Sequence, residues 1–216
     1  MVEYLPFIAD LFMVSGLIVG VAGFKRLLLP SRIIVLFLFV SSCIEAMGLY
    51  LVSGAGQHNN IWLYNAYILL QFLILILAGY YLAPTAASRK TLYIIIPLFF
   101  AVFAWELKTA TNLELFDLSF LISCVLLTGY YLLQLTSLLR ASEPVYSSIF
   151  LCLGVLIYTS CSIPAYSFFN HFTSLYGNMQ EVLHSARFIV SILLYAIICS
   201  SLIVEVRKQQ KVVTND

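Results

Sequence analysis

Seven long apolar stretches dominate the sequence and limit the folds that the chain can adopt. They cover approximately residues 5–24, 33–53, 61–83, 91–105, 115–139, 147–167 and 181–206. A helix needs about 20 mostly apolar residues to cross the roughly 30 Å hydrocarbon core of a bilayer. The runs are continuous and show no strand-like alternation, which argues against a transmembrane β-barrel. The sequence therefore predicts an all-α integral membrane protein, with a single seven-helix transmembrane domain over 1–206 and a short basic tail over 207–216.

Composition supports this fold class and excludes others. Only 10% of the residues are charged and 62% are hydrophobic, whereas about 25% are charged in an ordinary soluble domain. A soluble chain of this composition would lack the polar surface it needs. The net charge of +1 also argues against a nucleic-acid partner, which would require a basic patch. The partner that the composition predicts is the lipid bilayer.

The distribution of cations predicts the orientation. Nine of the 11 Lys and Arg residues fall at the same side of the predicted bundle: Lys25, Arg26, Arg32, Arg89, Lys90, Arg140, Arg207, Lys208 and Lys211. Cytoplasmic loops carry an excess of Lys and Arg. We therefore expect the N-terminus outside and the C-terminus in the cytoplasm.

Ionisable groups inside a span cost free energy, so each is a candidate functional group. The candidates singled out within the predicted spans are Asp10, Glu45, Asp117, His184 and Arg187. At about 1.5 Å per residue, they all fall in the outer half of the predicted bundle, whereas the uncharged Gln71 lies near the middle. The inner halves are expected to be almost wholly apolar apart from scattered Ser, Thr and Tyr.

This distribution predicts an outward-facing polar cavity that binds a small molecule. The expected ligand-binding residues are Glu45, Asn65, Asp117, Tyr158, His184 and Arg187, and the secondary ones are Asp10, Gln71, Gln180 and Glu181. Gln180, His184 and Arg187 share one face of the last span, because they are four and three residues apart.

Structural roles are also open for most of these residues. Asp10, Asp117 and Glu181 are compatible with solvated helix ends, and the last two with N-terminal positions that favour a carboxylate. Asn65 and Gln71 are compatible with hydrogen bonds between helices. Glu45 and Arg187 could form a purely structural ion pair or a binding pair.

Several kinds of chemistry are excluded or lack a motif. A retinal Schiff base requires a lysine inside the last span, yet all five lysines lie in loops or the tail. We therefore predict no cofactor. The histidines are too few inside the spans for a three-histidine zinc site, and no hydrolase or phosphate-binding motif is present. No enzyme activity is expected.

Short motifs lie at Ile61–Tyr67 with Gln71-Phe72, at Glu143-Pro144 before Ile149-Phe150 and Leu156–Tyr158, at Val182–His184, and at Glu45. Together they resemble a group of uncharacterised bacterial seven-helix proteins found beside sensor histidine kinases. Gln71 stands where a glutamate is common in that group, and Arg187 where the stretch is usually uncharged. The resemblance implies a sensor or accessory signalling protein of the bacterial cytoplasmic membrane, with a membrane kinase as a partner.

The sequence thus favours a sensor that passes a ligand- or proton-induced helix rearrangement to a separate partner. Two alternatives remain: a small-solute transporter and an intramembrane lipid-modifying enzyme.

Overall fold

The computed structural model of the chain describes residues 4–53, 60–83, 85–109, 115–140, 145–172 and 179–213. Within these ranges, side chains are described except at positions 52–53, 87, 165–172, 179–184, 187 and 209–213.

Seven of the described helices are long and apolar enough to cross a membrane, which confirms the all-α seven-helix fold class. They are α1 (Leu5–Gly23), α2 (Leu29–Ser53), α3 (Ile61–Leu82), α5 (Leu92–Thr109), α6 (Asp117–Leu139), α7 (Tyr146–Phe172) and α8 (Met179–Val213). Two short helical pieces, η2 (Phe24–Arg26) and α4 (Ala86–Lys90), precede α2 and α5. The predicted orientation in the membrane stays a prediction.

Four helices extend well beyond their predicted spans. The second begins at Leu29 rather than 33, the fourth continues to Thr109 rather than 105, and the sixth continues to Phe172 rather than 167. The last continues to Val213, so part of the predicted tail is helical. The prediction stopped at the charged residues Arg32 and Glu106. In the structure, Arg32 donates a hydrogen bond to the Leu27 carbonyl oxygen, and Glu106 accepts one from the Leu118 backbone N–H. Both helices therefore continue through these charged positions.

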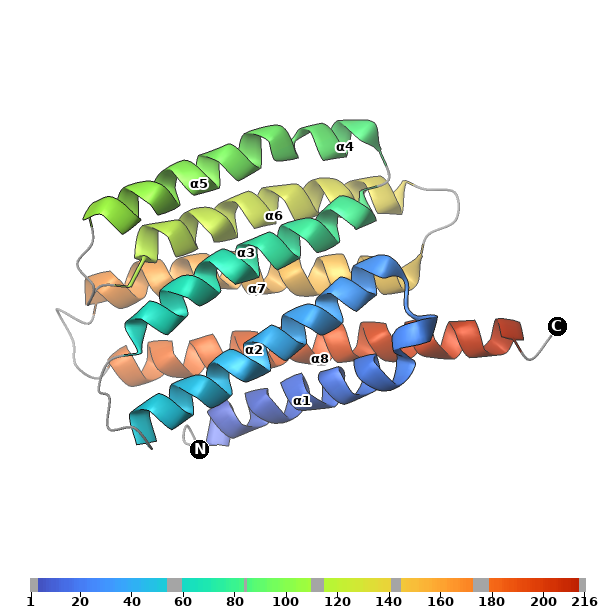
Figure 1. Cartoon of the computed structure of the whole chain (residues 1–216), viewed down its shortest axis with the longest axis horizontal. Coiled ribbons are helices and arrows are strands. Elements are labelled where there is room, and N and C mark those ends of the chain that lie inside the picture. Colours follow the sequence, from blue (N-terminus) through green and yellow to red (C-terminus); the bar gives the residue numbers. More distant parts are fainter. Residues whose placement is uncertain are drawn as a thin grey trace.

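Six of the helices form a closed ring of packed neighbours. The packed pairs are α1 with α2, α2 with α3, α3 with α6, α6 with α7, α7 with α8, and α8 with α1. The helix α5 lies outside this ring against α6, and only 11% of its span is buried, against 44% for α6. We call the end where α1 begins the amino end of the bundle, and the end where α8 terminates the carboxyl end. The segments that carry the nine clustered cations all lie at the carboxyl end (Figure 1); they are η2, the start of α2, α4, and the ends of α6 and α8.

Glycines bring α1 close to its two neighbours. A Cβ atom at Gly20 would overlap the side chain of Val35 on α2, and one at Gly23 would overlap Val206 on α8. Both glycines are buried. Small residues at helix interfaces let backbones approach closely in membranes, where packing rather than water exclusion drives association.

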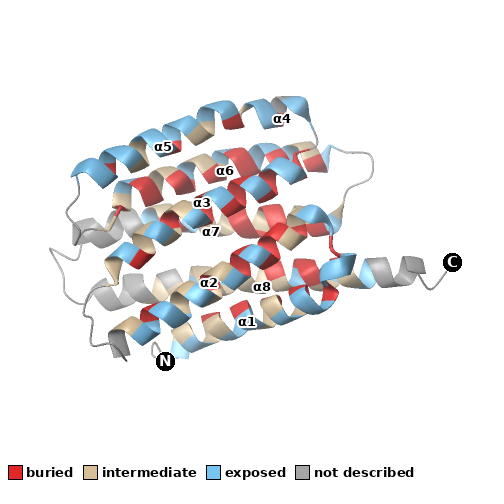
Figure 2. Ribbon diagram, in the orientation of Figure 1, coloured by how far each residue is buried: buried red, intermediate tan, exposed pale blue. Residues whose placement is uncertain are grey.

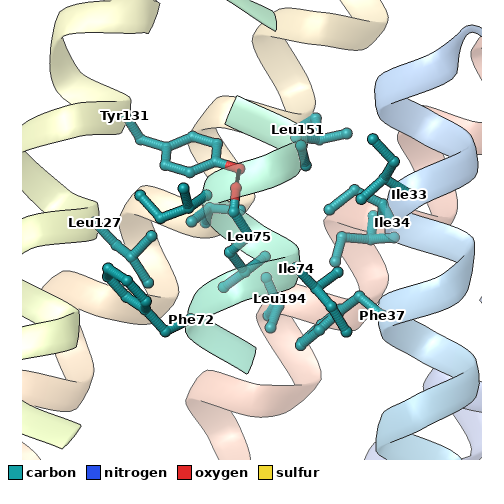
Figure 3. Packing of buried hydrophobic residues seen from close by; sticks show 14 of the residues in the cluster. Ile33, Ile34, Phe37, Phe72, Ile74, Leu75, Leu127, Tyr131, Leu151 and Leu194 are labelled. Carbon is teal, nitrogen blue, oxygen red and sulfur yellow. Dashed lines mark hydrogen bonds between the residues drawn. The ribbon is translucent and has the colours of Figure 1, made fainter. Parts of the chain in front are cut away.

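The core lies where the ring helices meet (Figure 3). Phe72 and Leu75 from α3 face Leu127 and Tyr131 from α6, and the Tyr131 hydroxyl donates a 2.8 Å hydrogen bond to the Leu75 carbonyl oxygen. Phe72 also stacks on Phe99 of α5, with ring centroids 3.8 Å apart. Through this pair the peripheral helix reaches the core.

The outward faces of the helices carry most of the exposed residues (Figure 2). Many are large and apolar, including Phe7 (69% exposed), Ile18 (64%) and Ile94 (72%). Such a surface is compatible with lipid tails and not with water. The bundle is therefore built to contact the bilayer on its sides.

Candidate functional site

A pocket of about 190 Å³ lies between α3, α6 and α7, in the half of the bundle nearer the amino end. Its described lining comprises Ile61, Tyr64, Tyr67, Ile68, Gln71, Leu115, Phe120 and Tyr158. Positions 61, 64, 68 and 71 lie three or four residues apart, so one face of α3 supplies them. The helix periodicity of α3 thus brings two polar and two apolar side chains to the same wall.

The deep side of the pocket is formed by a hydrogen bond between two helices. The Gln71 Nε2 of α3 donates to the Tyr158 hydroxyl of α7 over 3.1 Å, and Gln71 is only 4% exposed. An amide and a phenol can each take part in more than one hydrogen bond. A bound molecule could therefore use either group, or replace their mutual contact.

A second set of contacts ties the pocket to α2 and α8. The Tyr67 hydroxyl lies 2.7 Å from the Ser41 Oγ of α2. Ser41, Glu45 and Asp10 also lie near Tyr195 of α8. Polar groups from five helices therefore lie near one another in the amino half of the bundle.

Buried polar groups continue toward the carboxyl end. Thr128 of α6 donates to the Thr159 Oγ1 of α7 over 2.8 Å. Farther along α6, the Tyr130 hydroxyl and both amide atoms of Gln134 are buried without a hydrogen-bond partner among the described residues. Tyr130 and Gln134 lie one turn apart on one face of the helix.

The expectation that the inner halves are almost wholly apolar is wrong. Gln134 is fully buried and Glu205 is 4% exposed, and both lie in the half of the bundle that the prediction left apolar. Buried polar groups in proteins are retained where they have partners or a function.

The structure places the predicted residues in three groups. Gln71 and Tyr158 meet in the pocket. Asn65 and Asp117 lie beside it at the start of α6, where the Asn65 Oδ1 accepts a 2.9 Å hydrogen bond from the Phe116 backbone N–H. This bond agrees with the structural interpretation of Asn65 as a contact between helices.

The third group lies away from the pocket lining or outside the described side chains. Glu45 and Asp10 are partly buried near Tyr195. The backbones of Gln180, Glu181, His184 and Arg187 belong to α8, but their side chains lie outside the described residues. Whether Glu45 pairs with Arg187, and the binding role of every one of these residues, stays a prediction.

Sequence reasoning missed Glu106, a buried glutamate of α5 that contacts the start of α6. The Glu106 carboxylate, on α5, accepts hydrogen bonds from the backbone N–H groups of Leu118 at 3.0 Å and Ser119 at 2.7 Å. The first N–H groups of a helix have no partner within the helix, and the positive end of the helix dipole favours a carboxylate there. Its position directly after the predicted span was the only sequence signal.

A second missed glutamate lies at the opposite end of the bundle. The Glu205 carboxylate, on α8, accepts hydrogen bonds from the Leu28 backbone N–H and from the Ser31 Oγ, the latter at 2.6 Å. Here the sequence held a clear signal, because Glu205 lies inside the predicted span 181–206. An ionisable group inside a span is a candidate functional or structural group.

The described residues contain no group of three or more His, Cys, Asp and Glu side chains arranged to hold a metal ion. The chemistry that the pocket offers is hydrogen bonding by phenols and one amide beside apolar walls.

No protein-family model, curated protein or solved structure matches the chain. The resemblance to seven-helix proteins beside sensor histidine kinases therefore stays a prediction from short motifs.

Proposed function

We propose that this polytopic membrane protein is a sensor that binds a small, uncharged, amphipathic molecule in the pocket between α3, α6 and α7. The observation that carries the proposal is the Gln71–Tyr158 hydrogen bond in the wall of that pocket. A ligand that replaced this bond would change the contact between two ring helices.

The size and lining of the pocket support this class of ligand. An apolar cavity of about 150 Å³ can hold benzene, so about 190 Å³ accommodates a molecule slightly larger than that. None of the described lining residues carries a formal charge, and half of them offer a hydroxyl or an amide. An uncharged ring or short chain with one or two polar atoms matches both features.

The contacts around Gln71 also provide a route for a signal. Phe72, the next residue, stacks on Phe99 of the peripheral helix α5, and Glu106 of the same helix bonds the start of α6 beside the pocket. We propose that ligand binding shifts α5 and that a separate membrane protein, such as a kinase, reads this shift. A ligand can drive such a change only if it binds one arrangement better than the other.

The test uses 4-fluorophenol as a probe and follows its fluorine resonance with the full chain in lipid nanodiscs. We expect a saturable shift for the natural sequence. Ile68→Trp, which fills the pocket, should abolish this shift. Leu73 lies on the same helix with its side chain 37% exposed, and Leu73→Trp should leave the shift unchanged. Gln71→Leu should weaken binding by about tenfold, because one hydrogen bond is lost. Equal responses from both tryptophan variants would overturn the proposal.

A small-solute transporter is the second candidate, and the buried polar groups of Tyr130 and Gln134 favour it. They extend the polar row from the pocket toward the carboxyl end, where a transporter would need an exit. The two proposals differ in accessibility. In a transporter, Gln134→Cys in a background without other cysteines should react with a membrane-impermeant maleimide from the carboxyl side, and in a sensor it should not.

A further inference from the structure

A second concave surface lies far from the pocket, between the last turns of α1 and the first turns of α2. This groove has a volume of about 550 Å³ and is lined by Leu17, Val21, Phe24, Leu29, Arg32, Ile33, Val35, Leu36 and Phe39. All are apolar except Arg32. Leu36 (48% exposed) and Phe39 (54%) lie open along its side.

The groove has the length of one bilayer leaflet. From Leu29 to Phe39, α2 rises by about 15 Å at 1.5 Å per residue, which is half of a hydrocarbon core roughly 30 Å thick. The groove runs from the carboxyl end of the bundle, where the cations gather, toward its middle. It therefore follows the path that a lipid acyl chain takes below its headgroup.

Arg32 holds a fixed position at the headgroup end of the groove. Its Nε donates to the Leu27 carbonyl oxygen at 2.8 Å and its Nη2 to that of Lys25 at 3.1 Å, while the guanidinium carbon lies 5.5 Å from the centre of the Phe24 ring. Backbone carbonyls and an aromatic ring orient the guanidinium without neutralising its charge. The charge therefore remains available to an anion.

The surrounding charges are also positive. Lys25 and Arg26 are exposed next to Arg32, and no ion pair joins Arg32 to a carboxylate among the described residues. The carboxylate at this end of α2, Glu205, is engaged by Leu28 and Ser31. Three cations thus surround the entrance to an apolar groove.

We propose that this groove binds one anionic phospholipid, with an acyl chain along α1 and α2 and the phosphate at Arg32. Arginine is suited to phosphate because its planar donors match the phosphate oxygens, and basic clusters at the ends of membrane helices attract anionic headgroups. The site is independent of the proposed sensor pocket. The groove holds one particular lipid, whereas boundary lipids contact every outward face of the bundle.

Native mass spectrometry of the full chain with equal amounts of phosphatidylglycerol and phosphatidylcholine tests the proposal. We expect one phosphatidylglycerol to be retained preferentially. Arg32→Gln should reduce this preference about fivefold. Arg140→Gln removes an exposed cation from the end of α6, at the same end of the bundle, and should preserve the preference.

A second pair of variants separates the groove from simple headgroup attraction. Leu36→Trp blocks the groove without changing charge and should also remove the retained lipid, even if Arg32→Gln fails to fold. Leu132→Trp, on the 52% exposed face of α6, is its matched control. Equal retention of the two lipids, a preference that survives Leu36→Trp, or a dimer that excludes lipid from the groove would each overturn the proposal.

Discussion

Two helices of the bundle begin against a glutamate from a different helix, and the two starts are built differently. At the amino end, Glu106 accepts hydrogen bonds from two backbone N–H groups of α6, and Asn65 accepts a third from Phe116. At the carboxyl end, Glu205 accepts one from the Leu28 backbone and one from the Ser31 hydroxyl. Both carboxylates are buried.

The difference lies in which groups have another partner available. The backbone N–H groups of Leu118 and Ser119 have no acceptor inside α6, because they belong to its first turn. A serine hydroxyl can instead turn toward a carbonyl oxygen of its own helix. The start of α6 therefore depends more strongly on its glutamate, although three side-chain bonds from two helices share the task. A charge buried in a membrane helix can thus serve folding rather than ligand binding.

Removing Glu106 should have the largest effect. We expect Glu106→Ala to lower the free energy of unfolding by about 4 kcal/mol, because two charge-assisted hydrogen bonds are lost and two buried donors are left without partners. Equilibrium unfolding in mixed micelles with increasing dodecyl sulfate measures the change. Glu106→Gln keeps one acceptor oxygen and should lose about half as much. If Glu106→Ala lowered the free energy of unfolding less than Glu205→Ala, the start of α6 would not be the one that depends more strongly on its glutamate.

Removing Glu205 should have the second-largest effect. Glu205→Ala should cost about 3 kcal/mol in the same assay, because one backbone donor is orphaned while the Ser31 hydroxyl can find another acceptor. A double-mutant cycle with Ser31→Ala checks this reason. We expect a coupling energy of about 1 kcal/mol between the two residues, and strict additivity would contradict the direct contact.

The smallest effect is expected at Asn65. Asn65→Ala should cost about 1 kcal/mol, since a single hydrogen bond to an uncharged amide is lost. The same assay applies, and the informative combination is Asn65→Ala with Glu106→Ala. If both side chains secure one helix start, the α6 amides near positions 116–119 should show faster hydrogen exchange in the double variant than in either single variant. If exchange in the double variant is no faster than in the single variants, the two side chains do not secure the same helix start.

The seven helices could be predicted because hydrocarbon thickness fixes the length of an apolar run. Their packing partners could not. No local signal in the sequence joins Glu205 to Leu28, or Gln71 to Tyr158, because each contact connects segments far apart in the chain. The depth rule likewise treats a carboxylate near a span end as solvated, whereas the structure buries Glu106 against another helix.

The candidate site was predictable only in part, for a similar reason. The polar residues that the sequence singled out include Gln71 and Tyr158, which meet in the pocket. Depth alone cannot show which polar side chains bond to a backbone, as Asn65 does. It also gave no reason to consider Tyr64 or Tyr67, because tyrosines are too frequent in this chain to stand out.

The packing of α1 on α8 has a consequence for biosynthesis. The helix α1 leaves the ribosome before α8, which it contacts through Gly23 and Val206, and the glutamate that secures the start of α2 is also on α8. Contacts between segments so distant in the chain form late. The ring of helices therefore stays open in the membrane until α8 has been synthesised.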